Sequence, residues 1–392
     1  MPRTNNNWWR EFDLDEYVGV SSMKPTLGND PILAYKPIDE IEPEDRWLYE
    51  VNWFYHDDLL PDSTILDQFL SDARMMRGLA DGRGYIVLNL SLEAWCQPYR
   101  IEHIQGFFSN KGIPLDRVIY MTGALNAGEI FRRHAYKMKP LSVMEFEVHA
   151  SAKVRDGQIW TDQRTSIGKR FLCFNRIHRP HRLCLLSRLH RNALLDDFYY
   201  SFARTINGTD CMDYARKYMG HQVRDHQRLM SDLAKLDHLL PMVLDTNDWG
   251  PNLAHSHLPD NVLPFYASSG ISVVTETTGY DEEIFFSEKT FHPIRYCQPF
   301  IMVSAPGSLS YLKDLGYRTF DAWWDESYNS IEDHEDRLDA VVVQITAISK
   351  WSDDRFYRFM LESRDVCLHN LRVLKEASAM RKYTKIWDDL FP

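Results

Sequence analysis

The sequence contains no Cys-x-x-Cys pair, although six cysteines are spread along its 392 residues. Most of these cysteines lie within apolar periodic segments, where a reduced thiol behaves as a small hydrophobic side chain. We therefore expect buried free thiols in a reducing compartment rather than a framework of disulfides.

Long apolar runs are absent as well. No stretch approaches the roughly eighteen apolar residues of a membrane-spanning helix. The amino-terminal residues "MPRTNNNWWREFDLDEY" have neither the basic start nor the apolar centre of a secretory signal. These absences predict a cytoplasmic protein without a membrane span, located in the host cytoplasm if the chain is viral.

The usual nucleotide and metal motifs are also missing. No G-x-G-x-x-G follows the first expected strand and no G-x-x-x-x-G-K-[ST] occurs, which disfavours dinucleotide oxidoreductases and P-loop NTPases. No H-E-x-x-H occurs and no D-x-D stands at a strand end. His178 and His181 are three residues apart, but the arginines around them disfavour a divalent cation. We expect no metal.

The net charge of -11 argues against a protein whose whole surface grips nucleic acid. The charge is uneven, however, because residues 168–192 are rich in Lys, Arg and His and contain no acid. This stretch indicates a local anion site.

Strand-like and helical patterns alternate in both halves of the chain, which predicts an α/β fold with parallel sheets. We expect two Rossmann-like domains, residues 1–165 and 166–392, with a cleft between them and terminal helices packing across. The expected strands are 46–55, 84–95, 116–127, 169–176, 198–204, 270–279 and 299–306. The expected helices are 63–82, 98–113, 179–195, 211–238, 287–297 and two amphipathic helices separated at residues 351–352.

The segment "SEKTFHP" stands where a helix should begin after a strand. Ser287 suits the N-cap, while Glu288 and Lys289 fall in the first turn, where a helix terminus favours anions. Lys289 would hold a diphosphate and Glu288 would accept from sugar or ribose hydroxyls. Pro293 predicts a kink. The alternative is a capped helix with a solvated ion pair.

This pattern, with the later "QPFIMVSAPGS", resembles the donor-binding segment of the α-1,3-fucosyltransferase family and related GT-B glycosyltransferases. The residues that carry the resemblance are Ser287, Glu288 and Lys289, then Pro299, Phe300 and the turn 305–308. The chain is also similar to bacterial and phage sequences that contain "SEKTFKP" and "PGSL" blocks. His292 stands where those sequences have Lys, which weakens one phosphate contact.

The resemblance implies a nucleotide-diphosphate sugar as co-substrate, with no separate cofactor. It also implies a basic residue after the first strand of the second half, which is Arg176. We add Arg179 and Arg182 from the same basic segment and Glu276 at the end of a strand. The alternative for the three arginines is the solvated basic face of a helix.

The catalytic base is expected in the first half, on the acceptor side. Glu93 follows the apolar run "YIVLNLSL" at the end that should point into the cleft, where burial would raise a carboxyl pKa. A capping or solvated Glu93 is the alternative. Thr122, Gly123 and Asn126 could line the acceptor side, and the "HDD" loop at 56–58 is the reserve position for the base.

The leading hypothesis is an inverting, metal-independent glycosyltransferase that moves a hexose or pentose. The acceptor would be a glycan, or a hydroxymethylated pyrimidine in phage DNA. The alternatives are a non-catalytic binding protein on the same fold and a nucleotide-sugar epimerase. The sequence indicates no oligomeric state.

Overall fold

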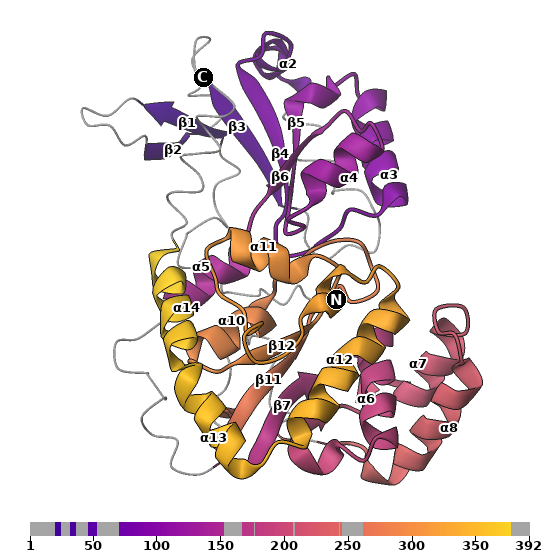
Figure 1. Ribbon diagram of the computed structural model, residues 1–392. Helices are drawn as coiled ribbons and strands as arrows, with labels where there is room; N and C mark the ends of the chain where they lie inside the picture. Colours follow the sequence, from indigo (N-terminus) through magenta and orange to yellow (C-terminus); the bar gives the residue numbers. More distant parts are fainter. Residues whose placement is uncertain are drawn as a thin grey trace. The chain divides into compact units, whose positions relative to one another are not determined.

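The computed structural model describes residues 20–24, 32–36, 46–52, 70–152, 167–175, 177–206, 208–242, 244 and 262–377. Its described residues form two compact units (Figure 1), which change over between Glu145 and Phe146. The boundary between residues 165 and 166 that the sequence predicts lies outside the described residues and stays a prediction.

The first unit is built on a six-stranded sheet in the order β2-β1-β3-β4-β5-β6. The strands β3 to β6 are parallel, whereas β1 pairs antiparallel with both β2 and β3. The first two strands and the last were not expected from the sequence. The strands are β1 (Val20–Lys24), β2 (Ile32–Lys36), β3 (Trp47–Asn52), β4 (Gly84–Leu90), β5 (Val118–Thr122) and β6 (Lys139–Ser142).

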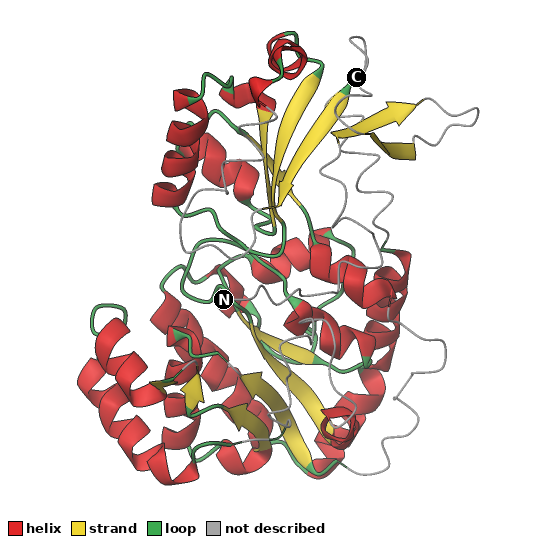
Figure 2. Ribbon diagram, turned by 180° about the vertical axis from the view of Figure 1, so that it is seen from behind, coloured by secondary structure: helices red, strands yellow, loops and turns green. Residues whose placement is uncertain are grey.

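The central strands β4 and β5 are buried along their whole length, as their continuous apolar sequences predict for a parallel sheet covered on both faces. Helices α3 and α4 lie side by side against this sheet in both views (Figures 1 and 2). The helices of this unit are α2 (Ala73–Ala80), α3 (Pro98–Asn110) and α4 (Ala127–Arg133).

Strand β4 is shorter than the expected strand 84–95, because a turn begins directly after Leu90. The side-chain oxygen of Asn89 accepts from the backbone N–H of Ser91 at 3.1 Å and from its hydroxyl at 2.7 Å. Asn competes in this way for the backbone and favours turns over strands. Glu93 consequently lies in a turn, three residues beyond the strand.

The second unit contains a fully parallel sheet in the order β12-β11-β7-β8. All four strands were expected from the sequence. They are β7 (Lys169–Asn175), β8 (Phe198–Phe202), β11 (Ser269–Thr275) and β12 (Phe300–Val303). A short antiparallel pair, β9 (Thr205–Ile206) and β10 (Thr209–Asp210), follows β8.

Helices cover both sides of this sheet (Figure 1), with α6 packed on α8 and α12, and α10 packed on α14. The structure thus confirms an α/β fold built from two Rossmann-like units, with a mostly parallel sheet in the first and a fully parallel sheet in the second. The helices of the second unit are α5 (Glu145–Ala152), α6 (Pro180–Arg191), α7 (Cys211–Tyr218), α8 (His226–Leu236), α9 (Leu263–Ser268), α10 (Glu288–Arg295), α11 (Ser308–Asp314), α12 (His334–Ser349), α13 (Asp353–Glu362) and α14 (Arg364–Glu376).

One expectation about the helices is wrong. The described residues from 334 to 376 hold three helices rather than two, because a second break falls at Ser363 between α13 and α14. Helix α10 continues through Pro293 to Arg295, and the kink expected there stays a prediction. A proline removes one backbone hydrogen bond, and the buried residues 290–294 supply enough packing for the helix to persist.

The six cysteines are free and buried, which confirms the expectation from their apolar surroundings. Burial raises the pKa of the Cys173 thiol to about 12, so this side chain stays protonated and unreactive. Within the described parts of the chain, no helix is long and apolar enough to cross a membrane.

Candidate functional site

The candidate site lies where the connections of the second sheet change direction. From β7 the chain moves outward to β8, and it then returns to the other side of β7 to form β11 and β12. In open parallel sheets, ligands bind in the crevice outside the carboxyl ends of the two strands at such a switch point. The residues after β7 and β11 are therefore the first place to look.

The loop after β7 leads into α6, and the start of this helix carries two of the predicted arginines. Arg182 is only 2% exposed. Its Nη1 donates to the carbonyl of Ile177 at 3.0 Å, and its Nη2 donates to the carbonyl of Thr275 at 3.0 Å. A second carbonyl, that of Glu276, lies 3.4 Å from Nη2. Arg182 thus ties the loop after β7 to the end of β11.

Arg179 is the N-cap residue of α6 and is half-buried. Burial, followed by the charge of Arg179, lowers the pKa of Arg182 to about 10. Among the described residues, no carboxylate pairs with either guanidinium, and no acceptor meets the buried Nε of either side chain. Two cations therefore lie close together without a carboxylate at ion-pair distance among the described residues, although the charges of Glu276 and Glu288 act on Arg182 and that of Asp281 acts on Arg179. Two neighbouring cations of this kind favour a bound anion.

His181 lies between these arginines in sequence and is buried. Its Nε2 donates to the carbonyl of Glu276 at 2.8 Å. Burial, and next the charge of Arg182, holds the pKa of His181 well below its usual range. Gly279 packs against the imidazole so closely that a Cβ there would lie 2.4 Å from its Cγ. A neutral His181 therefore fixes the loop after β11 against the start of α6.

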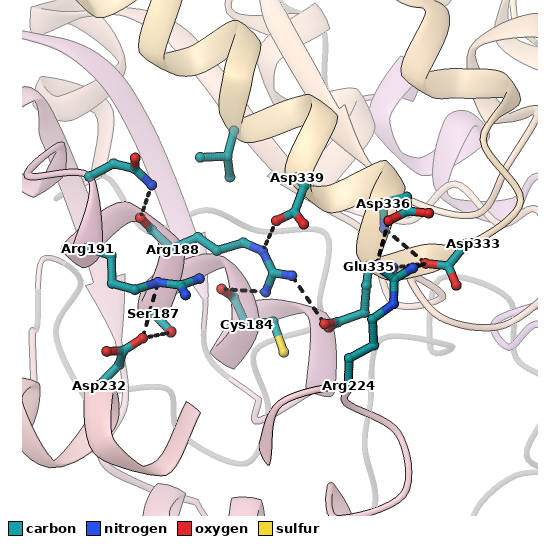
Figure 3. Close-up of polar contacts among 12 residues, drawn as sticks. Cys184, Ser187, Arg188, Arg191, Arg224, Asp232, Asp333, Glu335, Asp336 and Asp339 are labelled. Atoms are coloured by element: carbon teal, nitrogen blue, oxygen red, sulfur yellow. Dashed lines mark hydrogen bonds and ion pairs between the residues drawn. The ribbon is translucent and has the colours of Figure 1, made fainter. Parts of the chain in front are cut away.

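At the carboxyl-terminal end of α6, in contrast to its start, the cationic side chains are paired with acids (Figure 3). Nη2 of Arg188 lies 3.2 Å from Oε2 of the buried Glu335, and Nε of Arg188 lies 2.5 Å from Oδ1 of Asp339. Nε of Arg191 lies 3.2 Å from Oδ2 of the buried Asp232. Acids from α8 and α12 thus neutralise this end of the helix, and positive charge remains only at its amino-terminal end.

Helix α10 begins beside the end of β11, as the sequence predicts. Ser287 is its N-cap, and its Oγ accepts from the backbone N–H of Lys289 at 3.3 Å. The same Oγ accepts from Nζ of Lys289 at 3.2 Å, and Nζ also lies 2.6 Å from Oε1 of Glu288. The side chains of Lys289 and Glu288 are 25% and 15% exposed, so this ion pair is largely enclosed rather than solvated.

Glu276 follows β11 directly and is fully buried. Its carboxylate accepts from the backbone N–H and the hydroxyl of Ser287, at 3.0 Å and 2.6 Å. It also accepts from the hydroxyl of Thr290 at 2.5 Å and from the backbone N–H of Thr277 at 3.2 Å. Glu276 therefore anchors the start of α10 to the sheet.

Arg337 of α12 lies at the same edge of the second sheet, and the sequence did not indicate it as a site residue. It is 5% exposed, and its Nε donates to the carbonyl of Ser304 after β12 while its Nη2 donates to that of Gly279. Arg337 stands four residues before Val341 on the buried side of its helix. The sequence signal that could have identified Arg337 is the presence of an arginine within the apolar stripe of a helix.

In the first unit, the structure brings together residues that follow β4 and β5. The backbone carbonyl of Glu93 accepts from the N–H of Gly123 at 2.9 Å and from the hydroxyl of Thr122 at 3.1 Å. Asn126, in the same loop after β5, is the N-cap residue of α4. These loops form one edge of the first sheet, with Glu93 half-buried there.

Several predicted positions lie outside the described residues, namely Arg176 and the "HDD" loop at residues 56–58. Among the residues that the structure does describe, no group of three His, Cys, Asp or Glu side chains is arranged to hold a metal ion.

No protein-family model and no curated protein matches the chain. Among solved structures, the chain is similar to an α,α-trehalose 6-phosphate synthase from Burkholderia multivorans, with 13% identity, 89% of this chain and 70% of that chain covered, and a TM-score of 0.42. It is also similar to a UDP-forming α,α-trehalose-phosphate synthase from Burkholderia vietnamiensis, with 12% identity, coverage of 89% and 71%, and a TM-score of 0.41. A glycosyltransferase from Rickettsia africae gives 11% identity, coverage of 87% and 70%, and a TM-score of 0.34.

Proposed function

We propose that the chain is a glycosyltransferase of the GT-B type that uses a nucleotide-diphosphate sugar. The observation that carries the proposal is the pair Arg179 and Arg182, which lies without a carboxylate partner among the described residues at the switch point of the second sheet. A diphosphate supplies the negative charge that this pair lacks.

The proposed role of each cationic side chain follows from how exposed that side chain is. Arg179 and Lys289 are accessible enough to contact the diphosphate, whereas the buried Arg182 adds to the positive potential and holds the loops in place. Glu288 accepts from a hydroxyl of the ribose or the sugar, as the fucosyltransferase resemblance implies. The resemblance also assigns Arg176 to the diphosphate.

The proposed reaction is an inverting transfer with Glu93 as the general base. Glu93 takes the proton of the acceptor hydroxyl while the hydroxyl oxygen forms a bond to the anomeric carbon. The bond from that carbon to the diphosphate breaks, and the nucleoside diphosphate leaves with the electron pair. Cationic side chains stabilise the leaving group in place of a metal ion.

The acceptor side is proposed to be lined by Thr122, Gly123 and Asn126. Its hydroxyl would belong to a glycan, or to a hydroxymethylated pyrimidine in phage DNA, as the similarity to phage sequences suggests. The cytoplasmic location expected from the sequence is compatible with both.

The test is release of nucleoside diphosphate from a panel of UDP-, GDP-, CDP- and dTDP-sugars, first with water and then with candidate acceptors. We expect one donor to be turned over, with the rate largely kept in EDTA. Glu93→Gln should lower transfer about a hundredfold while nucleotide affinity stays the same.

Three outcomes would contradict parts of this proposal. Tight nucleotide binding with no turnover of any donor would identify a binding protein instead. Loss of transfer in EDTA and its recovery with manganese would remove the metal-independent mechanism. Near-normal transfer by Glu93→Gln would move the base elsewhere, and residues 56–58 would be tested next.

A further inference from the structure

The carboxylate of Glu276 has its hydrogen-bonding capacity filled from within the chain. Four donors reach its two oxygens, from Thr277, Ser287 (twice) and Thr290. An ionised carboxylate offers about four lone-pair sites. A hydroxyl of a bound nucleotide could be accepted only by displacing one of these partners, and the side chain is fully buried.

The main chain of Glu276 is equally fixed. Its N–H donates to the carbonyl of Val303 at 3.0 Å, and its carbonyl accepts from His181 at 2.8 Å. The carboxylate therefore projects from a point tied to β12 and α6. Such a group can position other residues with little freedom of its own.

The residue that Glu276 positions most directly is Ser287. The Ser287 hydroxyl has one proton, and the structure directs it to Oε2 of Glu276 at 2.6 Å. The lone pairs of the hydroxyl are then left to accept from the backbone N–H and from Nζ of Lys289, at 3.3 Å and 3.2 Å. A chain of contacts thus runs from Glu276 through Ser287 to the ammonium of Lys289.

We propose that Glu276 is a positioning residue that orients Ser287 and, through it, the Lys289 ammonium toward the diphosphate. This inference rests on the proposed function, because it takes Lys289 to be a contact of the nucleotide. It departs from the sequence-based expectation that Glu276 itself binds the donor. A carboxylate is suited to the task because it can only accept, so the Ser287 proton cannot turn toward Lys289.

The test is a double-mutant cycle between Glu276→Gln and Lys289→Ala, read out by the Kd of the nucleoside diphosphate that binds best among UDP, GDP, CDP and dTDP. An amide in place of the carboxylate puts a donor against at least one of the four N–H or O–H groups. We expect Glu276→Gln to weaken binding about tenfold in the wild-type background and less than about twofold in the Lys289→Ala background.

The matched control is Glu147→Gln. Glu147 is another buried carboxylate of the same unit, and it accepts from the hydroxyl of Tyr317. Its replacement should change the melting temperature without changing the Kd. If Glu276→Gln does not fold, Ser287→Ala replaces it in the cycle, because this change removes the relay and leaves the carboxylate in place.

The outcomes separate this proposal from the proposed function. If the wild-type chain binds no nucleoside diphosphate, the proposed donor site is wrong, and the positioning role of Glu276 is wrong with it. If the wild type binds and Lys289→Ala weakens binding, but the second mutation adds its full effect, Glu276 does not act through Lys289 and the positioning role is wrong. Unchanged affinity in Glu276→Gln would also overturn the positioning role.

Discussion

At the scale of single residues, the candidate site depends on which cations have an acid beside them. Arg182 donates only to backbone carbonyls among its described partners, and Arg179 lies close enough to lower the pKa of Arg182. Carbonyl dipoles orient a guanidinium without cancelling its charge. The positive potential at this edge is therefore available to a ligand.

Arg179→Ala should weaken the binding of a nucleoside diphosphate by about 1.5–3 kcal/mol, the usual effect of losing a charge-assisted hydrogen bond. Arg228→Ala is the control, because it removes the same charge from an exposed position on α8. Isothermal titration of both variants checks the prediction. Equal affinities in the two would remove Arg179 from the site.

His181 predicts a pH dependence of stability. Burial, and then Arg182, lowers its pKa in the folded chain, whereas the unfolded chain regains a value of about 6.5. The unfolded state then binds more protons below that pH. The contribution of His181 to the free energy of unfolding is therefore present above about pH 6.5 and is lost as the pH falls toward the folded pKa.

His181→Gln keeps an N–H donor near the Glu276 carbonyl but cannot titrate. Between pH 7 and pH 5, its free energy of unfolding should fall less steeply than that of the wild type, by up to about 1.4 kcal/mol per pH unit. His178, whose pKa burial also lowers, leaves a residual slope in both proteins. Urea unfolding at each pH gives the comparison, and parallel slopes would contradict the assignment to His181.

At the scale of elements, the two ends of α6 differ in how their charges are paired. Its first turn carries the two arginines without acidic partners, while Arg188 is enclosed between Glu335 and Asp339 of α12 (Figure 3). The hydroxyl of Tyr280, in the loop after β11, also donates to Glu335 at 3.0 Å. The buried pair thus connects α6, α12 and that loop.

Glu335→Ala should lower the free energy of unfolding by about 3–5 kcal/mol, because it leaves the buried Arg188 without its enclosed partner. Asp336→Ala is the neighbouring control, since Asp336 pairs with Arg224 at the surface and its loss should change stability little. Denaturant unfolding measures both variants. Similar losses in the two would show that burial of the Arg188 pair is unimportant.

The sequence predicts the strands of both sheets well where they are continuous apolar runs, as in β4, β5 and β11. It does not predict which arginines of the basic segment remain without acids. That outcome depends on Asp232, Glu335 and Asp339, which are far away in sequence and arrive only through helix packing. Ser287 and Lys289 were placed correctly at the start of α10, because a serine cap is a local signal.

At the scale of the whole molecule, the chain combines two α/β units with an acidic overall charge of -11. The first unit presents Glu93 with the loop after β5, and the second presents a cationic edge at its switch point. Under the proposed function, the first unit binds the acceptor and the second unit binds the donor. The proposed function requires above all that the cationic edge of the second unit binds a diphosphate.

The most direct test is isothermal titration of the full chain with UDP, GDP, CDP and dTDP, each compared with its monophosphate. We expect at least one diphosphate to bind, and the matching monophosphate to bind at least about tenfold more weakly, because the second phosphate contacts Arg179 and Lys289. Absence of binding by all four diphosphates, or equal affinity for the monophosphate, would contradict this expectation.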